Sequence, residues 1–434
     1  MRSSNWILKI KKYVAVPIVL LGAAILGWLL LMVVYSLPHT KIAQNVAGGI
    51  QTLLVEGAEF EYASGYKAAI LDNQTEAVML SEAVFPSNNP IRDSLSIPRY
   101  IYSGRDTQEL SLMAYLNNDT ETERIVSTYP RYWHGYLVPV KIFFSVFDFA
   151  DSRMFHLALQ LFLVVAVLYL LDKRGLREYI LPFVMVMALW NMASTGICMQ
   201  YYACFYVTIF AVLFMLWRQH YLSSDPFRFH MFFLVIGIAT SYFDFLTYPI
   251  ATLGIPLVMW VIGNGGKTMQ GIQLILNAIF WGIGYLGMWL EKWILSSIVL
   301  KENVVLDAVE NVASRTSVEV GAESVSRVGT IVYLFQTLIK WPYVIMFGIA
   351  LIGIVGWGIR RIEKINTLFT KKNIYNLFTF GIIALLPCVW FFVTANHSYV
   401  HPRLVYRGWG VSIFAIYAGL ISFFKSDINE ETPN

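Results

Sequence analysis

Charged residues are scarce in this chain, because Asp, Glu, Lys and Arg make up only 14% of it, against about 25% in an average soluble domain. Apolar residues make up 57%, and the mean hydropathy is +0.57. This composition excludes a water-soluble fold. The chain also has only three cysteines, all in or near hydrophobic segments. Neither a disulfide framework nor a CxxC metal site is therefore expected.

The chain consists largely of long apolar runs that are separated by short polar breaks. A helix that crosses the hydrocarbon core of a bilayer needs about 20 apolar residues. We therefore predict an all-α polytopic membrane protein with about ten transmembrane helices. The first run, Val14 to Tyr35, is too long for the apolar region of a signal peptide, so we expect it to be a retained anchor.

The placement of basic residues predicts how these helices are oriented. Arg2, Lys9, Lys11 and Lys12 precede the first span, which holds the N-terminus in the cytoplasm by the positive-inside rule. The same rule places the short turn Asp172–Arg177 and the C-terminus inside. A tight glycine turn at Gly263–Lys267 is expected on the cytoplasmic side as well.

This topology divides the chain into six regions. They are a cytoplasmic N-terminus with the first helix (1–36), an extracytoplasmic loop domain (37–150), a transmembrane bundle (151–294), a second extracytoplasmic loop (295–340), C-terminal transmembrane helices (341–424) and a cytoplasmic tail (425–434). An interfacial helix is expected in the later part of the second loop.

The first of three polar clusters on the outer side lies in Ile70–Leu80, within the large loop. Asp72 and Glu76 are four residues apart and share one face if this stretch is helical. Their repulsion raises one pKa, which suits a general base, and the same pair could hold a divalent cation. The alternative is a solvated helix start with Asp72 as its N-cap.

The second cluster is Tyr242–Pro249, at the outer end of the fifth predicted span. Asp244 lies there among apolar and aromatic residues. An ionisable residue at membrane depth is by default a functional candidate that faces the bundle interior. We therefore select Asp244 as a catalytic candidate and the nearby Tyr248 as a substrate contact. A structural ion pair or an interfacial cap is the alternative.

The third cluster, Ala395–Arg407, joins the last two spans and brings His397, His401, Arg403 and Arg407 to the outer interface. Basic residues on the outer side break the positive-inside rule. An anionic ligand explains them, because Arg binds phosphate with two hydrogen bonds and the start of the last helix adds its dipole. Anchoring to lipid headgroups is the alternative.

An aromatic segment, Tyr129–Tyr136, precedes the amphipathic stretch Leu137 to Phe147. Arg131, Trp133 and His134 within it are candidates for binding a sugar ring by stacking. An aromatic belt at the membrane interface is the alternative explanation.

A long first outer loop with acidic residues, many spans and a basic outer cluster resemble the type C glycosyltransferase fold of integral membrane enzymes. Four segments, Asp72–Glu76, Tyr132–Tyr136, Asp244–Pro249 and Asn396–Ser398, resemble bacterial multi-pass proteins associated with surface polysaccharides. The resemblance implies inverting sugar transfer from a polyprenyl-phosphate carrier to an acceptor on the outer face of the plasma membrane. A loop carboxylate then deprotonates the acceptor hydroxyl, and Asp72 is the base by this analogy, with Glu76 beside it.

The sequence therefore predicts a glycosyltransferase of the cell envelope. Asp72 or Glu76 activates the acceptor, Asp244 orients the sugar or a metal, and Arg403, Arg407 and a histidine hold the carrier phosphate. The expected partners are a lipid-linked sugar donor, a glycan or lipid acceptor and membrane lipids, with no nucleic acid. A divalent cation is the one cofactor considered. The alternatives are a transporter or flippase for a lipid-linked glycan and a non-enzymatic assembly subunit.

Overall fold

The structure is a computed structural model that describes residues 2–264, 270–361 and 368–425. Eight helical segments in these residues are long and apolar enough to cross a membrane. They comprise α1 (Arg2–Tyr35), α8 (Phe149–Lys173), α11 (Tyr202–Ser223), α12 (Pro226–Phe243), α14 (Gln270–Leu300), α17 (Trp341–Ile359), the pair α18 (Lys371–Ala384) and α19 (Leu386–Val393), and α22 (Trp409–Lys425). The prediction of an all-α polytopic membrane protein is confirmed.

Two shorter apolar helices, α9 (Ile180–Trp190) and α13 (Ile250–Gly263), lie among the long ones. Helix α9 runs beside α22, because Tyr179 and Ser422 are hydrogen-bonded at one end (3.2 Å) and the Trp190 indole donates to the Arg407 carbonyl at the other (2.8 Å). Helix α9 ends at Asn191, whose φ of 57° turns the chain into α10 (Met192–Ile197). With these two helices the apolar bundle has ten members in the described residues, but only eight of them reach full spanning length, so the count of about ten transmembrane helices stays a prediction.

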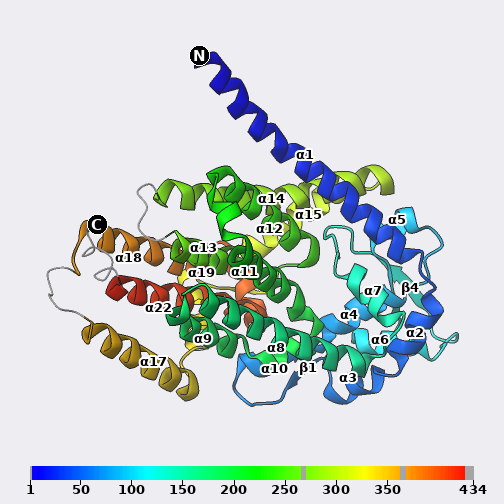
Figure 1. Ribbon diagram of the computed structural model, residues 1–434. Coiled ribbons are helices and arrows are strands. Elements are labelled where there is room, and N and C mark those ends of the chain that lie inside the picture. The colour runs from blue at the N-terminus through cyan, green and yellow to red at the C-terminus, as the bar shows by residue number, and fades with distance from the viewer. Residues whose placement is uncertain (1, 265–269, 362–367, 426–434) are drawn as a thin grey trace.

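The chain between α1 and α8 folds at one end of the bundle, on the right in Figure 1. We call residues 37–148 the loop segment. Its helices are α2 (His39–Ala47), α3 (Ile50–Glu56), α4 (Asn73–Val84), α5 (Pro90–Ser96), α6 (Gln108–Leu116) and α7 (Leu137–Phe144), with the short helix η1 (Lys67–Ala69). Its strands form two antiparallel pairs, β1 (Glu59–Glu61) with β2 (Ile70–Asp72) and β3 (Arg99–Tyr102) with β4 (Arg124–Ser127).

The connection from α14 to α17 is also structured. It contains α15 (Val304–Thr316), the two-residue strands β5 (Glu319–Val320) and β6 (Glu323–Ser324), and α16 (Arg327–Gln336). Helix α15 buries Val304 and Ala308 and leaves Leu306, Val309 and Val312 exposed. Such an exposed apolar stripe is typical of a helix at a membrane interface, but it occurs in the first part of the connection as well as in the later part where we expected it.

Helices α12 and α14 approach each other closely enough for their backbones to touch. A Cβ added to Gly237 would lie 2.1 Å from the Trp281 carbonyl oxygen, and one added to Gly284 would lie 2.2 Å from the Leu234 carbonyl oxygen. Small residues at such a crossing are how membrane helices pack without a hydrophobic driving force between them. This pair of glycines fixes the position of the segment that follows α12.

Two ion pairs involve residues close to segments that we assigned to the cytoplasm. Lys12 lies 2.5 Å from Asp225, and Lys425 lies 3.1 Å from Glu178. The second pair joins the C-terminal helix to the residue that follows the short turn Asp172–Arg177. Residues 265–267 of the expected glycine turn and residues 426–434 of the expected tail lie outside the described residues.

The remaining elements connect the bundle at the loop-segment end or turn the chain at the opposite end. They are η2 (Arg177–Tyr179), η3 (Met199–Tyr201), α20 (Ala395–Val400), α21 (Pro402–Val405) and η5 (Tyr406–Gly408).

Candidate functional site

Asp72 lies at the junction of β2 and α4, where it caps the helix. Its carboxylate accepts hydrogen bonds from the backbone N–H (3.3 Å) and the hydroxyl (2.9 Å) of Thr75. Arg403 lies 3.3 Å from the same carboxylate and 2.7 Å from Glu59, which pairs with Asp72 across the two strands. The side chain of Asp72 is almost completely buried. The first and third predicted clusters therefore meet through an ion pair, and Asp72 has the capping role that was its alternative interpretation.

Glu76 lies one turn further along α4 and is fully buried. It accepts a hydrogen bond from the Met199 N–H (3.3 Å) and lies 3.5 Å from Arg153. Arg153 in turn donates two hydrogen bonds, of 2.6 and 2.8 Å, to Glu56. One arginine thus serves two carboxylates. Burial raises the pKa of Glu76 to about 7, although Arg153 and the Met199 N–H oppose the shift.

Asp244 directly follows α12 and organises the turn into α13. Its carboxylate accepts the N–H groups of Leu246 and Thr247, each at 3.0 Å, and the Thr247 hydroxyl. No basic side chain of the described residues forms an ion pair with it. Burial raises the pKa of Asp244 to about 6, because these hydrogen bonds only partly offset the loss of water.

Arg407 and Tyr248 lie side by side in the interior. Arg407 is completely buried, with its guanidinium 3.7 Å from the centre of the Tyr201 ring. It donates to the carbonyls of Trp190 (3.3 Å) and Arg403 (2.5 Å) and to the Ser194 hydroxyl (3.0 Å). The Tyr248 hydroxyl donates to the Tyr201 carbonyl at 2.8 Å. Both predicted ligand contacts are therefore engaged in holding the bundle together.

His397 and His401 lie with their rings 4.9 Å apart. His397 donates through Nε2 to the Leu246 carbonyl (2.6 Å), which ties the third cluster to the Asp244 turn. His401 accepts at Nε2 from Arg315 (3.3 Å). Burial and the nearby guanidinium of Arg315 lower the pKa of His401 to about 4, and burial also holds the pKa of His397 well below its ordinary value. Both rings are neutral at neutral pH and supply no positive charge for a phosphate.

The predicted aromatic site is buried in the protein. Trp133 has no exposed surface, and its indole donates to the Met288 carbonyl at 2.7 Å. His134, with a φ of 53°, lies 3.1 Å from Glu82 and stacks on Phe245. Arg131 pairs with Asp307 at 3.2 Å. These residues join the loop segment to α14, to α15 and to the Asp244 turn rather than forming a belt at the membrane surface.

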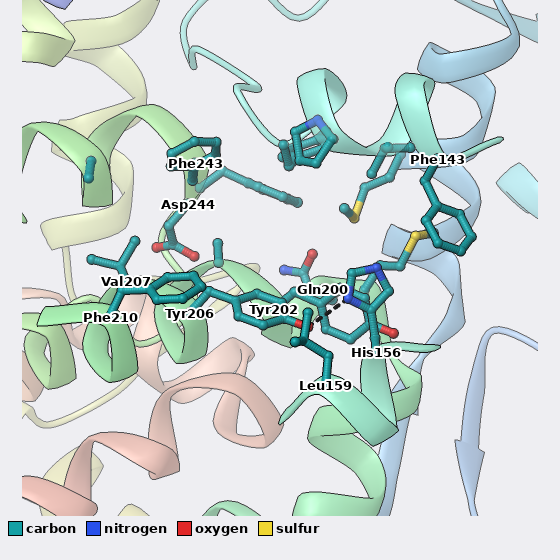
Figure 2. Close-up of a pocket in the computed structure, with 18 of the residues that line it drawn as sticks. Phe143, His156, Leu159, Gln200, Tyr202, Tyr206, Val207, Phe210, Phe243 and Asp244 are labelled. Atoms are coloured by element: carbon teal, nitrogen blue, oxygen red, sulfur yellow. Dashed lines mark hydrogen bonds between the residues drawn. The ribbon is translucent and has the colours of Figure 1, made fainter. Parts of the chain in front are cut away.

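An apolar cavity of about 580 Å³ opens between α7, α8, α11 and α12. Figure 2 shows Asp244 and Gln200 directed into it, above His156 and Tyr206, which are hydrogen-bonded at 2.7 Å. The Gln200 side-chain oxygen has no hydrogen-bond partner among the described residues. Asp244 is the one carboxylate that lines this cavity, and no Lys or Arg of the described residues lines it.

The structure thus brings most of the predicted residues together, but in different pairings. Asp72 meets Arg403, and the turn after Asp244 meets His397. Asp72 and Glu76 do not line the cavity, although Met79 on the same helix does. Sequence reasoning missed Glu82, which accepts the Tyr136 hydroxyl at 2.6 Å, and Arg153. The only signal for Arg153 was its position as a charged residue at the start of a span.

A metal centre is not visible among the described residues, where no group of three or more His, Cys, Asp or Glu side chains is placed to hold an ion. The positions beside the acidic pair are taken by Arg403 and Arg153. The positive charge beside Asp72 and Glu76 therefore comes from these two guanidiniums, at the place where we had considered a divalent cation.

The apolar helices and the buried polar network define a multi-pass α-helical membrane protein. No family model, curated protein or solved structure matches the chain.

Proposed function

We propose that this protein is a membrane glycosyltransferase that takes a sugar from a polyprenyl-phosphate carrier and transfers it to a cell-surface acceptor. The observation that supports this proposal best is the carboxylate of Asp244 in the wall of an apolar cavity bounded by three membrane-length helices. A hydrocarbon chain suits such a cavity, because its walls are almost entirely apolar. The phosphate and sugar of the carrier would then lie next to Asp244.

The reaction needs one carboxylate as a general base. Asp244 accepts the proton of the acceptor hydroxyl while the oxygen attacks the anomeric carbon. The bond between this carbon and the carrier phosphate breaks, and the phosphate leaves with the electron pair. The new glycosidic bond forms on the opposite face of the sugar, so the configuration inverts. The proton ends on Asp244 and the negative charge on the carrier.

Asp244 suits this role better than the residues suggested by resemblance. Asp72 faces Arg403 and caps α4, and Glu76 is held by Arg153 and the Met199 N–H. A base must reach its substrate, and Asp244 is the carboxylate in contact with the cavity. Asp72 and Glu76 remain important in the proposal, because they fix α4, which contributes Met79 to the cavity wall.

Arg403 does not line the cavity, but it is the basic residue of the third cluster best suited to meet the carrier phosphate. Its Nε has no hydrogen-bond partner in the described part of the chain. Its pairing with Glu59 is half exposed, with 52% of the Glu59 side chain accessible, and such pairs are weak. A phosphate could therefore compete for this guanidinium, whereas Arg407 is fully committed to internal acceptors.

The experiment uses proteoliposomes that contain the full chain and a polyprenyl phosphate carrying a radiolabelled sugar. We expect label to pass to an added acceptor glycan. Asp244→Asn should lower this rate about 100-fold or more, because general-base catalysis contributes about 10²–10⁴-fold. The asparagine can still accept the two N–H groups of the turn. Asp106→Asn is the matched control, because Asp106 is exposed in the loop segment.

The main rival function is a flippase for the lipid-linked glycan, which would use the same cavity. A flippase would, in the same experiment, move the carrier across the bilayer without transferring any sugar. That outcome would overturn the proposal. Equal transfer rates for the wild type and Asp244→Asn would show that Asp244 is not the general base.

A further inference from the structure

A second cavity, of about 270 Å³, lies on the other side of the Asp244 turn, between α14, α15 and α19. One wall is an aromatic ladder on a single face of α14, formed by Trp281, Tyr285, Trp289 and Trp293. Adjacent rings lie 4.8 Å apart between Trp281 and Tyr285, and again between Tyr285 and Trp289. Leu246 from the turn lines the same cavity. Consecutive residues of the Asp244 turn therefore line the two cavities.

Three residues that line this cavity carry hydrogen-bond donors without partners. The Tyr285 hydroxyl and the indole N–H groups of Trp289 and Trp390 are buried and have no acceptor among the described residues. Buried Tyr and Trp normally find a partner for these groups, because leaving a buried donor unpaired is unfavourable. The two indoles can only donate and the hydroxyl can donate or accept, so a partner that supplies acceptor oxygens satisfies all three.

Arg315 of α15 adds positive charge to the same cavity. Its guanidinium donates a hydrogen bond to His401, which is a neutral acceptor. No carboxylate of the described residues lies within ion-pair distance of it. Arg131, the other arginine of the cavity, is by contrast paired with Asp307. The guanidinium of Arg315 is therefore available for an anionic group, which it can bind with two hydrogen bonds.

We propose that this second cavity binds one acidic sugar, whose ring packs on the α14 ladder and whose phosphate or carboxylate pairs with Arg315. Sugar hydroxyls supply the acceptor oxygens that the three aromatic donors lack, and the C–H face of the ring suits the aromatic wall. A purely apolar ligand would leave both the donors and the guanidinium unpaired. The role of this sugar in transfer rests on the proposed function, but its binding does not.

The acidic group has two sources, which separate probes distinguish. A phosphate would come from a sugar phosphate such as the carrier head, and a carboxylate from a uronic acid of the acceptor. Calorimetric titration of the purified full chain with glucose 1-phosphate, glucuronic acid, glucose and inorganic phosphate measures each affinity. We expect at least one acidic sugar to bind about tenfold or more tightly than both glucose and inorganic phosphate.

Variants locate the binding in this cavity. Arg315→Gln should reduce the affinity for the acidic sugar about tenfold or more, because hydrogen bonds to charged groups are the strong ones. Trp289→Phe and Trp390→Phe should each reduce it about two- to tenfold. Trp409→Phe is the matched control, because its indole N–H is also unpartnered but the residue does not line the cavity. Thermal unfolding of each variant shows that the fold is retained.

The outcomes separate this inference from the proposed function. If neither acidic sugar binds, or if Arg315→Gln binds as the wild type does, the inference is wrong. If neither acidic sugar binds more tightly than inorganic phosphate, the inference is also wrong, because the aromatic ladder would then have no role. Unchanged acidic-sugar binding in a protein that shows no transfer would leave the inference standing and reject only the glycosyltransferase.

Discussion

The buried carboxylates of this site differ in whether a basic side chain lies beside them. Asp72 has Arg403, Glu76 shares Arg153 with Glu56, and Asp244 has only hydrogen-bond donors. A carboxylate that loses water without gaining a cation favours its protonated form. Burial accordingly raises the pKa of both Glu76 and Asp244 above the ordinary carboxyl value. Of the carboxylates in the described residues, Asp244 is the one that lines the apolar cavity.

The pKa of Asp244 predicts how transfer depends on pH. Burial raises this pKa to about 6, and a general base acts only when it has lost its proton. The rate of sugar transfer at low donor concentration should therefore rise as the pH increases through about 6 and level off above it. Rates measured in proteoliposomes between pH 5 and 8 test this. A rate that falls over the same range would mean that the essential group acts as an acid.

The raised pKa of Glu76 predicts how the stability of the fold depends on pH. Here the protonated carboxyl is the favourable form, whereas Asp244 must lose its proton to act as a base. Its pKa is about 7 in the folded protein against an ordinary value of 4.5 for Glu76, so the folded state binds more protons than the unfolded chain between these pH values. The free energy of unfolding should fall as the pH rises through this range, by about 3 kcal/mol in total. Glu76→Gln should remove much of this dependence, because glutamine does not ionise.

Thermal unfolding in detergent at pH 5 and pH 8 compares the wild type with Glu76→Gln. Glu310→Gln serves as the control, because Glu310 is an exposed carboxylate on α15. The control should keep the full difference between the two pH values. If Glu76→Gln keeps it as well, the buried carboxyl of Glu76 is not its source.

At the scale of elements, helix positions were easier to predict than helix contacts. The first apolar run, Val14 to Tyr35, lies within α1 (Arg2–Tyr35), and the amphipathic stretch Leu137 to Phe147 contains α7 (Leu137–Phe144). Hydrophobic periodicity and turn residues are local signals, which explains this agreement. No local sequence signal indicates that Asp72 forms an ion pair with Arg403 or that Arg407 donates its hydrogen bonds to main-chain carbonyls. Those pairings follow from the packing of distant segments.

The site also depends on the crossing of α12 with α14, because α12 presents Asp244 and α14 carries the aromatic ladder. Gly284→Ala should destabilise the protein by about 1–3 kcal/mol, because the added methyl group would press against the Leu234 carbonyl. Gly282→Ala on the same helix meets nothing within 4 Å, so it should be neutral or stabilising. Thermal unfolding of the two variants measures the difference. Equal unfolding temperatures would show that the two backbones are not in contact.

The apolar cavity, formed by α8 and α11 among others, gives a prediction about substrate affinity. Ala203→Phe on α11 places a large side chain in the cavity wall, so it should raise the KM for the lipid-linked donor several-fold with a smaller effect on kcat. Ala158→Phe is the control, because Ala158 lies exposed on α8 and does not line the cavity. Steady-state transfer rates at several donor concentrations separate the two constants. An unchanged KM in Ala203→Phe would mean that the hydrocarbon chain lies elsewhere.

For the whole molecule, charge placement and structure agree on which segments lie together, whereas orientation in the membrane stays a prediction. The loop segment lies at one end of the bundle (Figure 1), and the Lys425–Glu178 pair joins two segments that charge placement assigns to the cytoplasm. Composition alone was sufficient to predict a polytopic helical protein, because apolar residues in such number have to face lipid. The sugar-binding interpretation of the aromatic segment failed to foresee burial of Trp133, since sequence does not reveal which neighbours cover a side chain.

The positive-inside rule makes the orientation testable with single cysteines on the two ends of the molecule. Asp106 in the loop segment and Lys173 at the far end of α8 are both exposed, and the native Cys198 and Cys204 are buried. With Cys388 replaced by serine, a membrane-impermeant maleimide applied to intact cells should label Asp106→Cys at once. It should label Lys173→Cys only after the membrane is permeabilised, because basic turns stay in the cytoplasm. The reverse pattern would place the loop segment and the Asp244 turn inside the cell, where a carrier-linked sugar would have to be met on the cytoplasmic leaflet.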